Sequence, residues 1–192
     1  MGQYYRVATI DKNGERKFYN REVDGQYTMA KLMEHSWWEN PFVSCITKFL
    51  YKNPLTIAWV GDYATDDAAF AGKRTECVSM LDDIYQKTWG EGSEAIGVTL
   101  DEISLDGKYL VNHTLKMYVD CDAYREKSSM EGEFAGWVIH PIPLLTAIGN
   151  GCGGGDYWGE NQDIVGTWAL CEISVEDEAP SDYTELDVSF RE

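Results

Sequence analysis

The dipeptide Asn13-Gly14 lies between two runs with the composition of β-strands, Gln3–Ile10 and Glu15–Glu22. Asparagine and glycine tolerate the positive φ angles that both central residues of a type I′ turn require, so the pattern predicts a β-hairpin with this dipeptide at its tip. Strands joined by so short a turn pair antiparallel. The first 24 residues therefore constrain the fold more than any other segment.

Charged residues beside the turn suggest how the two strands are aligned. With Asn13-Gly14 at the tip, Lys12 faces Glu15 and Asp11 faces Arg16, so both pairs are of opposite charge. Opposite charges across a strand pair are favourable and like charges are not. We therefore expect this register rather than one that places Asp11 opposite Glu15.

The rest of the chain shows helical signals early and strands later. N-capping residues precede the expected helices at Thr28, Asn40 and Thr75. Strand-like runs are Leu55–Val60, Lys108–Val119, Trp137–Ile142, Gly166–Val175 and Tyr183–Phe190. Because strands and helices do not alternate regularly, we expect an α+β fold: a mainly antiparallel sheet with an N-terminal β-hairpin and two or three short helices. We expect residues 1–192 to form a single domain from which the hairpin of residues 1–24 protrudes.

The composition is that of a folded, acidic chain. Of its 192 residues 44% are hydrophobic and 13% aromatic, which argues against intrinsic disorder. A net charge of −17 excludes a wholly basic nucleic-acid coat and a binder of anionic membranes. Prolines and glycines interrupt the uncharged stretch 134–155, so we expect no membrane span. Five cysteines without a CxxC pair predict reduced thiols and a cytoplasmic location.

In the expected register, one face of the hairpin carries three cations around a tyrosine. These candidate nucleic-acid-binding residues are Arg6, Lys17, Tyr19 and Arg21. Cations bind a phosphate backbone and an aromatic ring stacks on an unpaired base, so the face predicts contact with RNA. The alternative is a solvated edge strand whose charges only prevent pairing with other chains.

The two ends of the chain differ strongly in charge. Residues 1–21 contain five basic and two acidic residues, whereas residues 153–192 contain one basic and eleven acidic residues. Such acidity often serves solubility alone. The alternative is a surface that imitates nucleic-acid phosphates and occupies the basic groove of a partner, which would make binding fast and sensitive to salt.

The residues with catalytic potential lie around the glycine-rich loop Gly149–Gly155. A loop that folds back would bring His140 and Asp156 together as an acid–base pair, which defines the hypothesis of a small hydrolase. The loop contains the letters GxGxxG but no βαβ context, so we expect a turn rather than a dinucleotide site. A small-ligand sponge built on the loop is a further alternative. We expect no metal site and no cofactor, and a structural role for His113.

Several segments resemble uncharacterised small acidic proteins of phages and related mobile elements in Gram-positive bacteria. These segments are Met1–Tyr5, Lys31–Trp37, Trp59–Tyr63 and Gly149–Tyr157. In size, acidity and basic N-terminal hairpin the chain is also similar to some type II anti-CRISPR proteins, which inhibit an RNA-guided nuclease. The resemblance implies a defence inhibitor that acts inside the host bacterial cell.

The leading hypothesis is therefore a mobile-element inhibitor of a host RNA-guided defence nuclease. Its acidic surface would bind the nuclease effector, and the hairpin would engage the guide RNA or promote its cleavage, a ribonuclease-like activity. The expected partners are the nuclease and its guide RNA, without a membrane. The sequence leaves open whether the chain is itself catalytic and what its oligomeric state is.

Overall fold

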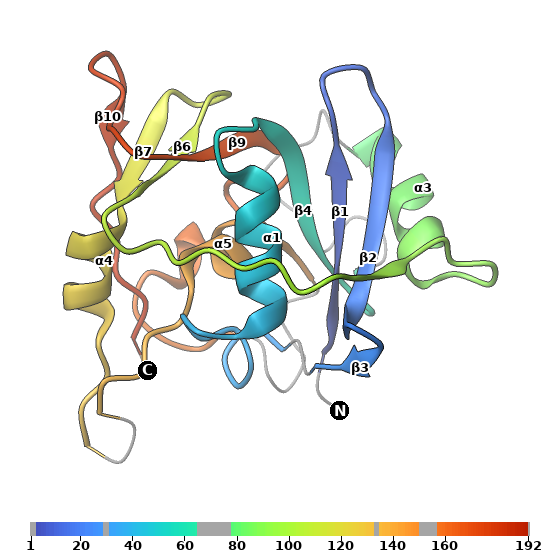
Figure 1. The fold of residues 1–192 in the computed structure, drawn as a ribbon, viewed down its shortest axis with the longest axis horizontal. Helices are drawn as coiled ribbons and strands as arrows, with labels where there is room; N and C mark the ends of the chain where they lie inside the picture. The colour runs from blue at the N-terminus through green and yellow to red at the C-terminus, as the bar shows by residue number, and fades with distance from the viewer. Residues whose placement is uncertain (1–2, 29–30, 65–77, 133–134, 150–156, 192) are drawn as a thin grey trace.

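A computed structural model describes residues 3–28, 31–64, 78–132, 135–149 and 157–191. The described strands form one sheet in the order β10-β7-β6-β9-β4-β1-β2-β3, with β5 paired to β2 and β8 to β4. Its strands are β1 Tyr5–Ile10, β2 Arg16–Val23, β3 Gln26–Tyr27, β4 Leu55–Gly61, β5 Ile96–Val98, β6 Tyr109–Asn112, β7 Met117–Asp120, β8 Ala147–Ile148, β9 Cys171–Glu176 and β10 Thr184–Glu185. The helices are α1 Pro41–Leu50, α3 Val78–Trp89, α4 Cys121–Ser128 and α5 Pro141–Leu145, with a short 3₁₀ helix at Gln162–Ile164. The α+β fold with a mainly antiparallel sheet and an N-terminal hairpin is confirmed (Figure 1).

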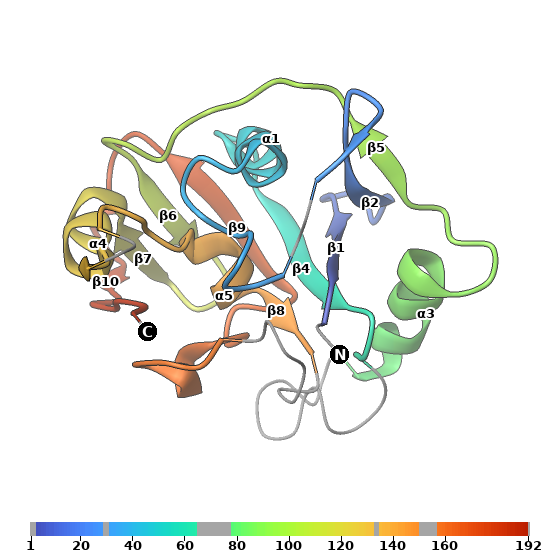
Figure 2. The same ribbon diagram turned by 90° about the horizontal axis from the view of Figure 1, so that it is seen from below.

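Helices cover both faces of the sheet because the central strands are apolar on both sides. Along β4, Ile57 and Trp59 enter one hydrophobic cluster while Ala58 and Val60 enter the other. Helices α1 and α5 contribute to the first cluster and α3 to the second. Figure 2 shows α1 and α3 on opposite sides of the strands. The predicted buried strand at Leu55–Val60 thus lies at the centre of the fold.

The hairpin forms, but its expected register is wrong by one residue. Val7 pairs with Tyr19 and Ile10 with Arg16, which places Asp11 opposite Glu15. The turn is longer than a type I′ turn: the Asp11 N–H donates to the Glu15 carbonyl, and Gly14 alone takes a positive φ, of 82°. The Asp11 carboxylate accepts hydrogen bonds from the Asn13 and Glu15 N–H groups, which offsets the like charge of the pair.

A one-residue shift of register moves one strand's side chains to the opposite face. Tyr19 therefore lies on the face of Val7, inside the core, and not on the face of Arg6. The expected protrusion is also wrong, because β1 pairs with β4 along all six of its residues. The fully exposed residues of the two strands lie next to the tip, and the hairpin is part of the sheet rather than an arm.

Capping residues explain where the helices begin. The Asn40 side chain accepts hydrogen bonds from the first free N–H groups of α1, and Pro41 occupies the first turn, as predicted. The expected strand at Trp137–Ile142 does not form: Ile139 makes only an isolated β-bridge with Trp37, and helix α5 begins at Pro141, capped by His140. The described residues 31–35 of the expected helix 29–35 form turns, without helix.

Replacing Gly14 with alanine tests the observed turn. A β-carbon at this position would have no atom within 4 Å, so a side chain meets no steric barrier and only the positive φ is strained. We expect Gly14→Ala to lower the free energy of unfolding by about 1 kcal/mol, and Gly14→Asn by less, because asparagine tolerates this region. Urea unfolding followed by circular dichroism measures both. Equal losses for the two variants would contradict the turn.

Candidate binding cleft

A cleft forms where the residues before α1, helix α4 and residues 136–138 meet, and Asp106 and Gly107 border its wider part. Backbone contacts hold these walls together. The Trp38 N–H donates to the Val138 carbonyl at 2.9 Å, and Trp37 forms a β-bridge with Ile139. The buried Tyr124 of α4 donates its hydroxyl to the Ile139 carbonyl at 2.7 Å, which joins the third wall to the other two. The cleft is thus preorganised by the fold.

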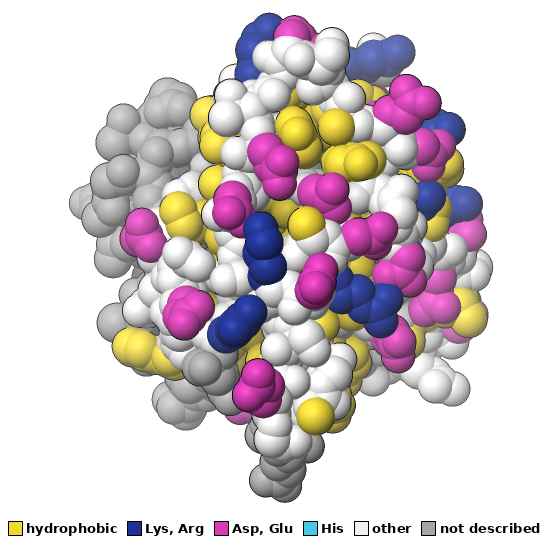
Figure 3. Space-filling view, turned by 90° about the vertical axis from the view of Figure 1, so that its left-hand side faces the viewer, with side chains coloured by type: hydrophobic (Ala, Val, Ile, Leu, Met, Phe, Trp, Pro, Cys, Tyr) yellow, Lys and Arg dark blue, Asp and Glu magenta, His cyan; other side chains and the backbone are white. Residues whose placement is uncertain are grey.

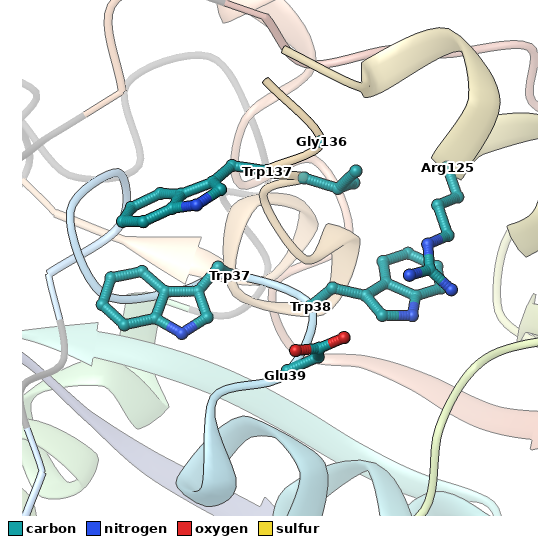
Figure 4. Close-up of a pocket in the computed structure, with 7 residues that line it drawn as sticks. Trp37, Trp38, Glu39, Arg125, Gly136 and Trp137 are labelled. Atoms are coloured by element: carbon teal, nitrogen blue, oxygen red, sulfur yellow. The ribbon is translucent and has the colours of Figure 1, made fainter. Parts of the chain in front are cut away.

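Tryptophans form the inner part of the cleft, a hollow of about 280 Å³ (Figure 4). The rings of Trp37 and Trp137 lie 5.3 Å apart between centroids, and Trp137 is 50% exposed. Trp38 is buried, and the Arg125 guanidinium lies 5.2 Å from the centre of its ring. Glu39 also lines this hollow. Indole rings, one carboxylate and one guanidinium therefore share a small volume.

A wider hollow of about 620 Å³ adjoins the first and shares Arg125, Gly136 and Val138 with it. Its acidic lining residues are Asp106, Asp122 and Glu126. Asp106 forms an ion pair with Arg125 and accepts a hydrogen bond from the Trp38 indole at 3.2 Å. Partial burial opposes its ionisation, but hydrogen bonds from neighbours including Arg125 outweigh burial and lower the pKa of Asp106.

The residues predicted to bind RNA do not form one surface. Arg6 projects to the face opposite Lys17, Tyr19 and Arg21, where its guanidinium lies 4.1 Å from the ring centre of Trp89 and donates to the Thr88 carbonyl. Of these four residues, only Lys17 projects strongly into solvent, with Glu15 3.4 Å away. The prediction of a shared cationic face is therefore wrong, because it depended on the incorrect register.

Tyr19, the expected stacking ring, belongs to the hydrophobic core. It is 9% exposed and packs against Phe49 of α1, with ring centroids 5.2 Å apart. Burial raises the pKa of its hydroxyl. The guanidinium of Arg21 lies over another ring, that of Tyr4, at 4.5 Å. Stacking of a base on Tyr19 would require the core to open.

His140 is a capping residue inside the protein. Its Nδ1 accepts a hydrogen bond from the Ile142 N–H, its Nε2 lies 3.3 Å from the Thr47 hydroxyl, and Trp38 packs against its ring. The side chain is 2% exposed, and burial lowers its pKa to about 3. Asp156 and most of the glycine loop lie outside the described residues, so the proposed pair stays a prediction.

His113 has the structural role expected from the sequence. Its Nε2 lies 2.8 Å from the Ser174 hydroxyl, which donates to Glu176, and its Nδ1 lies 3.3 Å from the Tyr183 hydroxyl. Ser174 is fully buried, so its hydroxyl is not accessible as a nucleophile. Within the described part of the chain, no group of three or more His, Cys, Asp or Glu side chains is placed to hold a metal ion.

Comparisons with protein-family models, characterised proteins and solved structures find no match to this chain. The described residues also contain no helix of the length and hydrophobicity needed to cross a membrane. Functional inference therefore depends on the cleft and on the distribution of charge.

Sequence reasoning missed the cleft, although one signal for it was present. The pair Trp37-Trp38, followed by Glu39, places large rings beside a charge just before a helix cap. Exposed rings of this size are unusual in a folded protein and mark binding sites more often than single exposed aliphatic residues do. The partner wall at Trp137 is a hundred residues away, and no local pattern connects the two.

Alanine substitutions distinguish the buried Tyr19 of the hairpin from its solvated neighbour Lys17. We expect Tyr19→Ala to lower the free energy of unfolding by about 3 kcal/mol, because it leaves a cavity beside Phe49. Lys17→Ala should change it by less than about 0.5 kcal/mol, because its side chain is solvated. Chemical denaturation measures both free energies of unfolding. An unchanged value in Tyr19→Ala would show that the ring is not part of the hydrophobic core.

The low pKa of His140 predicts a loss of stability in acid. Between pH 6.5 and about 3 the unfolded chain binds a proton at this residue while the folded chain does not, so stability falls as the pH drops below 6.5. One buried histidine contributes about 1.4 kcal/mol per pH unit, or roughly 2–3 kcal/mol between pH 6.5 and 4.5.

Asparagine at position 140 provides the control, since it keeps an acceptor for the Ile142 N–H but does not titrate in this range. Urea unfolding of both proteins at the two pH values gives the comparison. The loss of unfolding free energy between pH 6.5 and 4.5 should be smaller in His140→Asn by roughly 2–3 kcal/mol. The same dependence in both proteins would contradict the buried, neutral imidazole.

Proposed function

We propose that this chain is an acidic binding protein that docks on a positively charged surface of a nucleic-acid-binding partner. A host RNA-guided nuclease is the partner class that the sequence resemblance implies. Occupation of its basic groove would exclude the guide RNA or the target strand. The hairpin residues are not needed for this action, so the proposal depends on the acidic surface alone.

The observation that carries the proposal is that carboxylates of this chain neutralise most of its own described cations. Within the described ranges, nine lysine and arginine side chains lie within 4 Å of a carboxylate oxygen. The pairs are Arg16–Asp83, Lys17–Glu15, Lys31–Glu34, Lys48–Asp101, Lys52–Asp177, Lys87–Glu94, Lys108–Asp177, Arg125–Asp106 and Lys127–Asp187. Since acidic residues outnumber basic ones 33 to 16, the remaining charge on the surface is predominantly negative.

Three further cations are occupied by aromatic rings of the same chain: Arg6 by Trp89, Arg21 by Tyr4 and Lys116 by Tyr183. A polynucleotide backbone needs several accessible cations in a row. In the described parts of the chain, most cations are instead engaged by a carboxylate or a ring of the same chain. Contact with a basic protein is therefore favoured over direct contact with RNA.

An exposed group of acidic residues lies around α4 and β10. Asp122 and Glu126 project from the helix, and Glu185 and Asp187 lie on or beside the short strand; all four are solvent-accessible. Figure 3 shows acidic side chains spread over this face with lysine and arginine side chains among them. The cleft opens beside the same helix, so the acidic face and the cleft are continuous with one another.

Charge reversal on two sides of the molecule tests the proposal. The double variant Glu185→Lys/Asp187→Lys alters the acidic face outside the cleft, and Asp82→Lys/Glu91→Lys makes the same change of net charge in and just after α3. We expect the first to weaken binding to a guide-free type II RNA-guided nuclease by about tenfold and the second by less than about threefold. Calorimetry at low salt measures both affinities.

Binding by the unmodified protein should also weaken steeply between about 50 and 500 mM salt, and guide RNA should compete with it. Equal effects of the two double variants would show that only net charge matters and would reject a specific acidic face. Absence of binding to the nuclease at low salt would reject the partner class.

A further inference from the structure

The two hollows of the cleft differ in chemistry, and together they fit one kind of ligand. The inner hollow is aromatic, with Trp37 and Trp137 side by side (Figure 4). The outer hollow is lined by the carboxylates of Asp106, Asp122 and Glu126. Because they share Arg125, Gly136 and Val138, an extended ligand can enter both. Such a ligand would present a group that favours indole rings next to groups that favour carboxylates.

The charge of the lining selects against anions. Among the described residues that border the two hollows, four carry carboxylates, namely Glu39, Asp106, Asp122 and Glu126, against the single guanidinium of Arg125. That guanidinium is already paired with Asp106. A phosphate or a nucleotide would meet uncompensated negative charge, whereas a cation would be attracted at long range by the net charge of −17.

The faces of the tryptophan rings also favour a cation over an anion. A guanidinium or ammonium group over a tryptophan ring is attracted by the negative face of the ring. The cleft contains an internal example of such a contact, the Arg125 guanidinium above Trp38. Trp137 is half exposed and has Trp37 beside it, so a second cation from outside the chain can reach a ring within the same hollow.

The volumes of the two hollows also limit the size of the ligand. A hollow of about 280 Å³ is at the lower limit for pockets that enclose a whole small-molecule ligand, but it accommodates one long side chain. The outer hollow, of about 620 Å³, is open and suits the continuation of a peptide.

We infer that the cleft receives an arginine or lysine side chain of the partner, with neighbouring basic residues of the same segment lying along Asp122 and Glu126. This inference deepens the proposed function and rests on it: the acidic face would attract the basic partner, and the cleft would determine which segment of the partner is bound. Trp37 and Trp137 bind the cationic head group, and Glu39 supplies its counter-charge.

A short synthetic peptide of arginine and lysine between glycines provides the direct test, with a second peptide in which neutral citrulline replaces arginine. Both are titrated into the intact protein while the indole N–H signals are followed by NMR. We expect the arginine peptide to shift the signals of Trp37 and Trp137 and to bind about tenfold more tightly than the citrulline peptide. Equal affinities would overturn the inference, because citrulline keeps the shape and lacks the charge.

Variants locate the site. Trp137→Ala should weaken binding of the arginine peptide by about tenfold and Glu39→Gln by about threefold. Trp158→Ala is the matched control, because Trp158 is 56% exposed and does not line the cleft. Trp137→Phe keeps an aromatic ring and should bind with intermediate affinity. Unchanged binding in Trp137→Ala, with circular dichroism like that of the unmodified protein, would overturn the assignment.

Two further outcomes separate this inference from the proposed function. If tetramethylammonium alone binds as tightly as the peptide, the cleft is a small-cation site and the peptide assignment is wrong. If Trp137→Ala and Glu39→Gln bind the nuclease normally while Glu185→Lys/Asp187→Lys does not, the cleft inference fails and the acidic docking surface stands. Peptide binding without any nuclease binding would support the cleft and reject the nuclease.

Discussion

The antiparallel pairing of β1 with β4 holds the two halves of this protein together. Six residue pairs join the N-terminal hairpin to the centre of the sheet, and side chains of β4 enter hydrophobic clusters on both faces. β4 also pairs with β8 and β9, so it lies at the centre of the described sheet. A one-residue slip of β1 against β4 would move the side chains of β1 to the opposite faces of the sheet, so that Val7 and Ala8 would leave their clusters.

The structure shows what the positively charged side chains of this protein contact, which the composition does not. An excess of carboxylates is often only a means of remaining soluble. Here most of the described lysines and arginines are engaged by carboxylates or rings of the same chain, as in the pairs Arg16–Asp83, Lys52–Asp177 and Arg125–Asp106. The four hairpin residues predicted to contact RNA do not share one face, and the proposed contact with a basic protein does not depend on them.

The cleft is lined by aromatic rings, and the buried His140 is not available to it as a general base. Its polar groups are carboxylates and one paired guanidinium, and the nearby histidine, His140, is buried against Trp38 with its nitrogens engaged by Thr47 and the cap of α5. A general base must reach the substrate through hydrogen bonds. Rigid aromatic walls, by contrast, bind a ligand with little loss of side-chain entropy.

Local patterns in the sequence determined the hairpin, the cap at Asn40, the buried strand Leu55–Val60 and the α+β class, because turns, caps and alternating burial depend on neighbouring residues. The register was decided only in the folded state: the Asp11 carboxylate binds the turn's own N–H groups, and Tyr19 gains burial against Phe49, which together outweigh a favourable charge pairing. The cleft was likewise invisible to local reasoning, since Trp37, Arg125 and Trp137 are distant in the chain. Long-range hydrogen bonds such as that from Tyr124 to Ile139 bring them together, and such contacts exist only once the core has formed.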